Sequence, residues 1–158
     1  MRQHHSSDLR RGRFSEQGRV YLVTFTTQGR HRLFEQWPPA HAAARSLGAL
    51  ESWGDSRLIC WVLMPNHWHG LLQLGESSNL SRTVGRAKAL ATRGVREAVG
   101  TRVSVWSRNF HDRGMRKDED LRTAARYIVA NPLRAGLVER VADYPFWDAV
   151  WLVDENPV

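Results

Sequence analysis

Two apolar segments separated by only two residues most constrain the fold of this chain. Residues 57–64 read RLICWVLM and residues 67–74 read HWHGLLQL, with Pro65 and Asn66 between them. Proline and asparagine favour tight turns, and short apolar runs rich in β-branched and aromatic residues are typical of strands. The sequence therefore predicts two consecutive strands joined by a tight turn at Pro65 and Asn66.

Strand and helix patterns alternate on either side of this hairpin. Residues 19–28 alternate aromatic and β-branched side chains on one face, which is typical of a strand. After the break at Pro38 and Pro39, apolar residues recur at helical spacing and predict a helix that stops near Gly54. Three further elements are expected: a long amphipathic helix over residues 79–99, a fourth strand within residues 102–110 and a helix over about residues 118–130.

The predicted order is strand, helix, strand, strand, helix, strand, followed by an added C-terminal helix. This order indicates an α+β fold of the split βαβ or ferredoxin-like type, in which helices pack on one face of an antiparallel sheet. The other face of the sheet is expected to stay open. The fold alone names no function, because RNA-binding modules, metal chaperones and enzymes all use it.

The charge of the chain is the first indication of function. It has 158 residues with 23 Lys and Arg against 16 Asp and Glu, a formal net charge of +7. Such an excess favours a polyanionic partner, and the arginines that dominate it make bidentate contacts to phosphates and guanine edges. Nucleic-acid binding is therefore favoured over the alternative of a solvated basic surface or tail.

Other classes of protein are disfavoured by what the chain contains. Residues 1–14 carry charge and histidine where a secretion signal needs an apolar stretch, and no run approaches the roughly 18 apolar residues of a membrane span. We therefore expect a cytoplasmic, nucleoid-associated protein with no membrane partner. The only cysteine, Cys60, permits no internal disulfide and excludes a cysteine-cluster zinc site.

His67 and His69 are separated only by Trp68 in the predicted third strand. Residues i and i+2 of a strand point to the same face, roughly 6 to 7 Å apart along the backbone, so the imidazoles project together while Trp68 points the other way. Two such imidazoles can bind one divalent cation. The pattern is weak by itself, and a pair of ordinary hydrogen-bonded histidines is an equal alternative.

The predicted helix over residues 118–130 places a phenol and an amide together. At about 100° per residue, Tyr127 falls beside the apolar stripe of this helix, and Asn131 lies one turn further on the same flank. Pro132 disfavours helical geometry at Asn131, so the helix is expected to end there. Without other information, an amphipathic tyrosine at the core margin followed by an asparagine cap is the favoured interpretation.

Taken together, these motifs resemble those of a known family. MPNHWH followed by RYIVANPLRAGLVERVADYP resembles the REP-associated tyrosine transposases, a branch of the single-tyrosine transposases within the HUH endonucleases. The likeness runs from RGRFSEQGRVYLVTF through WSRNFHDRGMR to YPFWDAVW. It implies one domain over residues 1–158, with a basic N-terminal arm of about residues 1–18 and a short C-terminal tail of about residues 139–158.

The resemblance also implies a role for each motif. His67 and His69 would hold a divalent cation, Mg²⁺ or Mn²⁺, with Asn131 as the third ligand, and Tyr127 would be the catalytic nucleophile. The expected partner is single-stranded DNA with hairpins, the REP sequences. Attack on this DNA would leave a 5′-phosphotyrosine and a free 3′-hydroxyl, so that the same site could rejoin strands.

Four arginines are the DNA-binding candidates. Arg11 and Arg13 in the arm are candidates to read a short guide sequence beside each hairpin, and Arg126 and Arg134 flank the active-site turn and could hold phosphates. A solvated position is an equal alternative for each. Two other functions stay open, a non-catalytic nucleic-acid-binding module and a metal-dependent hydrolase that uses water. The target sequence, and whether the protein is a monomer or a homodimer, also stay open.

Overall fold

The centre of the fold is a five-stranded antiparallel sheet with the strand order β4-β1-β3-β2-β5. The structure is a computed structural model that describes residues 15–151. The α+β class and the antiparallel sheet that the sequence predicts are confirmed. The strands are β1 (Val20–Thr26), β2 (Arg57–Met64), β3 (His67–Gln73), β4 (His111–Gly114) and β5 (Trp147–Ala149).

The predicted hairpin forms the middle of this sheet. Strands β2 and β3 pair along their length, and Met64 lies opposite His67 at the turn of Pro65 and Asn66. Strand β1 pairs with the other edge of β3, which makes β3 the central strand. Position 70 of β3 requires glycine, because the indole of Trp68 lies over it. A Cβ at this position would be 2.5 Å from that ring.

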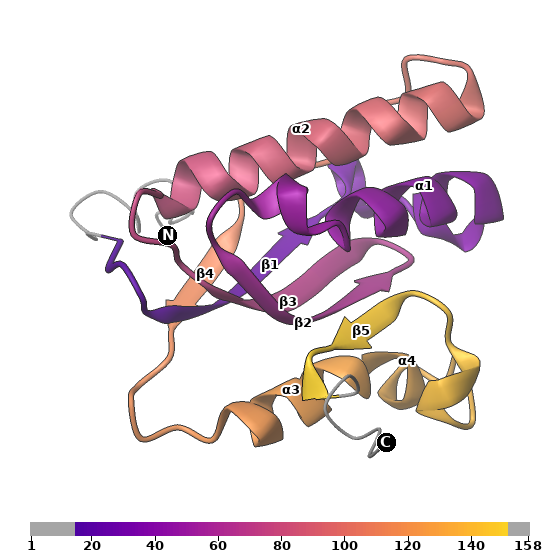
Figure 1. Cartoon of the computed structure of the whole chain (residues 1–158). Coiled ribbons are helices and arrows are strands. Elements are labelled where there is room, and N and C mark those ends of the chain that lie inside the picture. The colour runs from indigo at the N-terminus through magenta and orange to yellow at the C-terminus, as the bar shows by residue number, and fades with distance from the viewer. Residues whose placement is uncertain (1–14, 152–158) are drawn as a thin grey trace, which may run out of the picture.

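Two helices, α1 (Trp37–Leu47) and α2 (Leu80–Val99), cover one face of the sheet (Figure 1). The core on this face is built around Trp68, whose ring stacks on Phe25 and on Trp53 at centroid distances of 4.8 and 5.2 Å. Asn79 caps α2 by accepting a hydrogen bond from the backbone N–H of Arg82. Among the helices of residues 15–151, none is long and apolar enough to span a bilayer.

The predicted C-terminal helix is α3 (Leu121–Val129), and with the short α4 (Asn131–Arg134) it lies on the opposite face of the sheet (Figure 1). Ala125 and Ile128 are buried there in a second core with side chains of β2 and β3. The face that the sequence analysis left open is therefore open only in part. The reason is the apolar stripe of α3, which is most stable when it is removed from water.

The first helix is shorter than predicted. It ends at Leu47, and a separate 3₁₀ turn, η3 (Leu50–Trp53), follows. The apolar spacing that suggested one helix includes residues that are not buried together. Leu50 is 74% exposed, whereas the indole of Trp53 is buried and donates a hydrogen bond to the carbonyl oxygen of Leu47 at 2.8 Å. Two further 3₁₀ turns, η1 (Gln28–Arg30) and η2 (Leu33–Glu35), lie between β1 and α1.

The fourth strand lies outside the predicted range of residues 102–110. It is β4, His111–Gly114, which pairs with β1 at the edge of the sheet. Within the predicted range, Val105 and Phe110 are buried in the first core, but they belong to the irregular segment that precedes β4. Within that segment only Trp106 makes an isolated bridge, to Thr27.

A fifth strand that the sequence did not predict closes the β2 edge. After the 3₁₀ turn η4 (Val141–Asp143), β5 pairs with β2, placing Trp147 opposite Val62. The hydroxyl of Tyr144 donates a hydrogen bond to the carbonyl oxygen of Leu63, and the backbone N–H of Leu63 donates to Phe146 at 2.9 Å. The β2 edge is therefore satisfied within the chain along this stretch.

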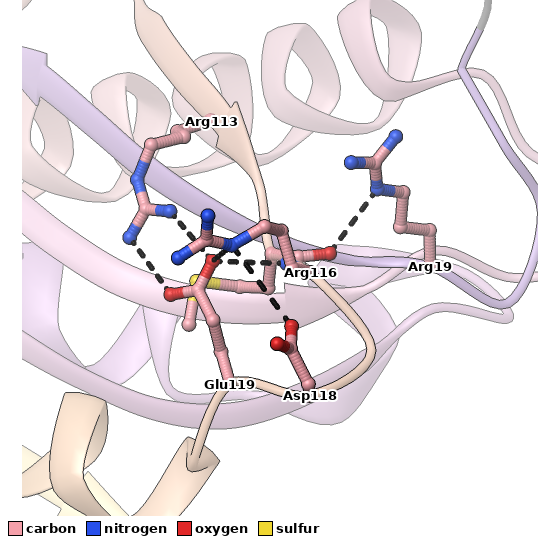
Figure 2. Close-up of polar contacts among 6 residues, drawn as sticks. Arg19, Arg113, Arg116, Asp118 and Glu119 are labelled. Carbon is pink, nitrogen blue, oxygen red and sulfur yellow. Dashed lines mark hydrogen bonds and ion pairs between the residues drawn. The ribbon is translucent and has the colours of Figure 1, made fainter.

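A charged network fixes the connection from β4 to α3 (Figure 2). The carboxylate of Glu119 accepts hydrogen bonds from the guanidinium of Arg113 at 2.9 and 3.3 Å and from the backbone N–H of Arg116 at 3.0 Å. These hydrogen bonds, that from Arg113 first, lower the pKa of Glu119. Asp120 then caps α3 at the backbone N–H groups of Arg122 and Thr123. The network and this cap therefore lie where the chain enters α3.

Candidate active site

The two histidines of the HWH motif lie side by side on the central strand. Trp68, between them, is fully buried against α1 and α2, whereas His67 and His69 are half-buried on the face that carries α3. The strand alternation predicted this arrangement. The imidazoles therefore lie on the same face of the sheet as α3 and α4.

Each histidine is held through its Nδ1 atom. The Nδ1 of His67 lies 2.8 Å from the Oδ1 of Asn66, and because an amide oxygen only accepts, this Nδ1 carries the proton. The Nδ1 of His69 is hydrogen-bonded to the hydroxyl of Thr24, its cross-strand neighbour on β1. Hydrogen bonds to Nδ1 orient a ring and leave Nε2 to bind a metal.

The environment keeps both imidazoles uncharged at neutral pH. Burial lowers the pKa of His69 to about 4, with smaller contributions from the charges of His67 and Arg134. Burial also lowers the pKa of His67, and the charge of Arg30 adds to this effect. A neutral imidazole keeps the lone pair that a metal ion needs.

Tyr127 lies on α3 and is 63% exposed. The guanidinium carbon of Arg134, from α4, is 3.7 Å from the centroid of its ring, which is cation–π contact. The same arginine is close enough to His69 for its charge to lower the pKa of that imidazole. Arg134 thus contacts the phenol and lies within electrostatic range of one histidine of the HWH motif, two groups that come from distant parts of the sequence.

Asn131 is the first residue of α4 and is half-buried. Helix α3 ends at Val129, and Ala130 leaves helical geometry with φ −81° and ψ 0° before Pro132 follows within α4. The predicted end of the helix is therefore nearly correct. However, Asn131 follows Tyr127 across a break in the helix, so the spacing of one regular turn applies only in part.

The remaining candidates lie on the surface or outside the described residues. Arg126 is exposed on α3, and Arg11 and Arg13 precede residue 15 and lie outside the part of the chain that the structure describes. Between residues 15 and 151, no group of three His, Cys, Asp or Glu side chains could hold a metal ion. A metal at the histidine pair would therefore take its further ligands from other groups, such as amide, water or substrate oxygens.

The sequence analysis missed two residues of this site. Asn66 was interpreted only as a turn residue, although its position next to His67 was a local signal of contact. Thr24 lies 45 positions from His69, and only the β1–β3 register brings the two together. No sequence spacing predicts that register.

Comparison with known proteins assigns the chain to a family. Residues 17–131 match the family model described as "Transposase IS200 like". The chain belongs to this family. A REP-associated tyrosine transposase from Escherichia coli (strain K12) is 31% identical over 87 residues, a match that covers 54% of this chain and 50% of that protein. A relative from Haemophilus influenzae is 33% identical over 98 residues, covering 56% and 54%.

The chain spans about half the length of the curated relatives that it matches. Solved structures extend the likeness to most of the fold. A REP-associated tyrosine transposase bound to a REP hairpin superposes with a TM-score of 0.66 at 23% identity, covering 92% of this chain and 86% of that one. A Deinococcus radiodurans R1 protein gives 0.53 at 17% identity, covering 76% and 95%. At these identities the structures show a common fold, and together with the sequence relatives they confirm the predicted resemblance to REP-associated tyrosine transposases.

Proposed function

We propose that this IS200-like transposase is a metal-dependent endonuclease and strand transferase that acts on single-stranded DNA beside REP-type hairpins. One observation carries the proposal, the position of Arg134. Its guanidinium covers the ring of Tyr127 at 3.7 Å, and its charge reaches His69. A nucleophile, a pair of metal-binding histidines and a phosphate-binding cation are what such a reaction needs in one place.

In this proposal, His67 and His69 hold the cation through Nε2, and the amide oxygen of Asn131 is the third ligand. The two histidines suit this role, because both rings are neutral and are oriented through Nδ1. Mg²⁺ prefers oxygen ligands, so a site with two imidazoles should accept Mn²⁺ readily. When bound, the cation would polarise the scissile phosphate and offset charge that develops on its oxygens.

Tyr127 supplies the nucleophile. Its phenolic oxygen loses a proton and attacks the phosphorus, the bond from phosphorus to the 3′ oxygen breaks, and that oxygen takes up a proton. The products are a 5′-phosphotyrosine and a free 3′-hydroxyl, and attack by a 3′-hydroxyl on the phosphotyrosine rejoins strands without ATP. Arg126 and Arg134 would hold phosphates of the strand. The 63% exposure of Tyr127 suits a nucleophile that must reach a polymer.

The test is a covalent adduct. Wild-type protein incubated with single-stranded hairpin DNA and Mg²⁺ or Mn²⁺ should give a protein–DNA band that resists SDS, and Tyr127→Phe should give neither adduct nor cleavage while it still binds the hairpin. Phenylalanine keeps the ring beneath Arg134 and removes one oxygen. An adduct peptide that maps to Tyr21 or Tyr144, or cleavage retained by Tyr127→Phe, would contradict the mechanism.

The same experiment separates the alternatives. A hydrolase that uses water would cleave without an adduct, and a binding module would shift the hairpin without cleaving it. The expected domain organisation also remains a proposal, with one domain over residues 1–158, an N-terminal arm that reads the guide sequence through Arg11 and Arg13, and action on DNA in the cytoplasm. Whether one chain or two form the active unit follows from the mass of the DNA complex in solution.

A further inference from the structure

A small cavity lies on the flank of α3 that points away from Tyr127. It has a volume of about 200 Å³ and lies between α3 and the C-terminal segment that contains β5. Figure 1 shows α3 and β5 next to each other on this side of the molecule. We call it the tryptophan notch and define it by five of the residues that line it, Arg122, Arg126, Val129, Trp147 and Trp151.

The helical repeat explains why the notch and the nucleophile lie on different flanks. Arg122, Arg126 and Val129 follow one another at spacings of four and three, so at about 100° per residue they share one side of α3. Tyr127 lies on the other side of the buried stripe formed by Ala125 and Ile128. An α-helix with its side chains is only about 10 to 12 Å across, so the two sites are a few nucleotides apart for a strand that crosses α3.

The notch combines apolar walls with a cationic rim. Trp147 and Trp151 are half-buried, whereas the two arginines are exposed at the edge. The guanidinium carbon of Arg122 is 5.7 Å from the centroid of the Trp151 ring, within range of a cation–π contact. The notch is therefore not closed by the core, and one indole face already lies next to a cation.

This chemistry matches one class of ligand. Proteins that bind single-stranded nucleic acid stack unpaired bases on aromatic rings and place arginines along the backbone, and every base offers a ring for such stacking. The cavity is smaller than the roughly 300 to 1,000 Å³ of pockets for drug-sized ligands, so its size suits a single ring system. The exposed arginines can also bind phosphate groups, which favours a nucleic acid over an uncharged aromatic ligand.

We propose that the tryptophan notch binds one unpaired nucleobase of the DNA strand on which Tyr127 acts. The base stacks on Trp151 and Trp147, and Arg122 and Arg126 contact the phosphates on either side of it. The inference rests on the proposed function, because it takes the strand from that reaction. It adds a second, non-catalytic contact that fixes how the strand crosses α3.

Photo-crosslinking tests the position of the base. The probe is a ten-nucleotide thymidine strand with one central 5-iodouracil, bound to the Tyr127→Phe protein so that no cleavage intervenes. Trypsin cleaves after Arg140, and the next peptide, residues 141–158, contains both Trp147 and Trp151 but none of the other tryptophans. We expect this peptide to carry the crosslink. Crosslinks found only elsewhere would overturn the proposal.

Affinity measurements test the energy of stacking. Trp151→Ala should weaken binding of the thymidine strand by about five- to a hundred-fold, the range of one stacked base, and Trp151→Phe should retain most of the affinity. The control is Trp37→Ala, which removes an indole that is 59% exposed on α1 and packs against Phe146 without lining the notch. Equal affinity of Trp151→Ala and wild type would refute the stacking site.

A second variant guards against a folding defect. Arg122 is exposed, so Arg122→Ala should leave the thermal melting curve unchanged and still weaken binding with a smaller salt dependence. An unchanged salt dependence would contradict the phosphate contact. If the wild-type protein bound no single-stranded DNA at all, the proposed function itself would fail. If the wild-type protein bound single-stranded DNA and no variant of the notch changed the affinity, only this inference would be refuted.

Discussion

At the scale of single residues, the orientation of the histidine pair depends on two neighbours that are not themselves proposed as metal ligands. Thr24 offers its hydroxyl to Nδ1 of His69, and Asn66 offers its amide oxygen to Nδ1 of His67. Both hydrogen bonds engage Nδ1 and leave the opposite ring nitrogen, Nε2, for a metal. The site is therefore oriented by residues on β1 and in the β2–β3 turn before any metal or DNA binds.

Thr24→Val tests this orientation. Valine keeps the shape of threonine and removes the hydroxyl, so His69 loses the hydrogen bond that orients its ring. We expect the affinity for Mn²⁺, measured by titration calorimetry without DNA, to fall by roughly 10- to 100-fold, the usual effect of losing such a partner. Thr24→Ser restores the hydroxyl and should restore the affinity. Unchanged Mn²⁺ binding by Thr24→Val would show that the hydroxyl has no such role.

The proposed metal ligands give a clearer prediction. His67→Ala or His69→Ala should abolish cleavage of single-stranded hairpin DNA while hairpin binding in a gel-shift assay stays largely intact, because the proposed DNA contacts are arginines elsewhere. Chelation with EDTA should reproduce the effect on cleavage. Full cleavage activity in either variant, or in EDTA, would refute the metal assignment.

At the scale of elements, the C-terminal segment closes the sheet. Tyr144 precedes β5, and its hydroxyl donates to Leu63 of β2, the strand that also carries the core of the α3 face. Burial raises the pKa of Tyr144 from 10.0 to about 12. The folded state therefore holds this proton more tightly than the unfolded chain does. The resulting stability is fully present below pH 10 and is lost as the pH rises towards 12.

Tyr144→Phe should therefore change stability in two ways. Near neutral pH the loss of the hydrogen bond should lower the free energy of unfolding by about 1 kcal/mol. Between pH 10 and 12 the variant should lose stability less steeply than the wild type, because the titrating phenol is gone. Urea unfolding at several pH values measures both effects. Tyr127→Phe, at an exposed position, is the control near neutral pH and should leave the free energy of unfolding there unchanged.

The elements also show which features sequence patterns can predict. Alternation along β3 placed Trp68 in the core and both histidines on the other face, because strand geometry is local. The pattern failed at β4, where Val105 and Phe110 are buried outside any strand and the polar HDRG segment pairs at an edge. It also missed β5, a strand of three residues that is held by its pairing with β2. Both strands form by pairing with a segment that is distant in the sequence, which local patterns do not show.

The candidate site likewise has features that local sequence patterns predict and features that only the fold determines. Strand and helix patterns singled out His67, His69, Tyr127 and Asn131. The resemblance implied their roles, which await the experiments above. The cation–π contact between Arg134 and Tyr127 joins α4 to α3 across the break at Ala130. Only the folded chain shows this contact, because the path of the backbone through such a break cannot be calculated from helical periodicity.

At the scale of the whole molecule, charge is distributed unevenly along the chain. The net charge is +7, and the first 13 residues contain Arg2, Arg10, Arg11 and Arg13 against one acidic residue, Asp8. Each phosphate contact made by a basic side chain releases counterions, so the number of contacts can be measured from the slope of log affinity against log salt concentration. The proposed role of the arm therefore has a direct physical readout.

Deletion of residues 1–13 should weaken hairpin binding and reduce this slope by about 0.7 to 0.9 for each phosphate group that the shortened protein no longer neutralises.

Two double variants that remove equal charge distinguish recognition of the guide sequence from general electrostatic attraction to DNA. Arg11→Ala with Arg13→Ala should reduce the preference for a hairpin that keeps its adjacent single-stranded sequence over the same hairpin without it. Arg2→Ala with Arg10→Ala should weaken binding to both hairpins equally. An unchanged salt slope after the deletion would show that the arm binds no phosphate, and an equal effect of the two double variants would show that it attracts DNA without reading it.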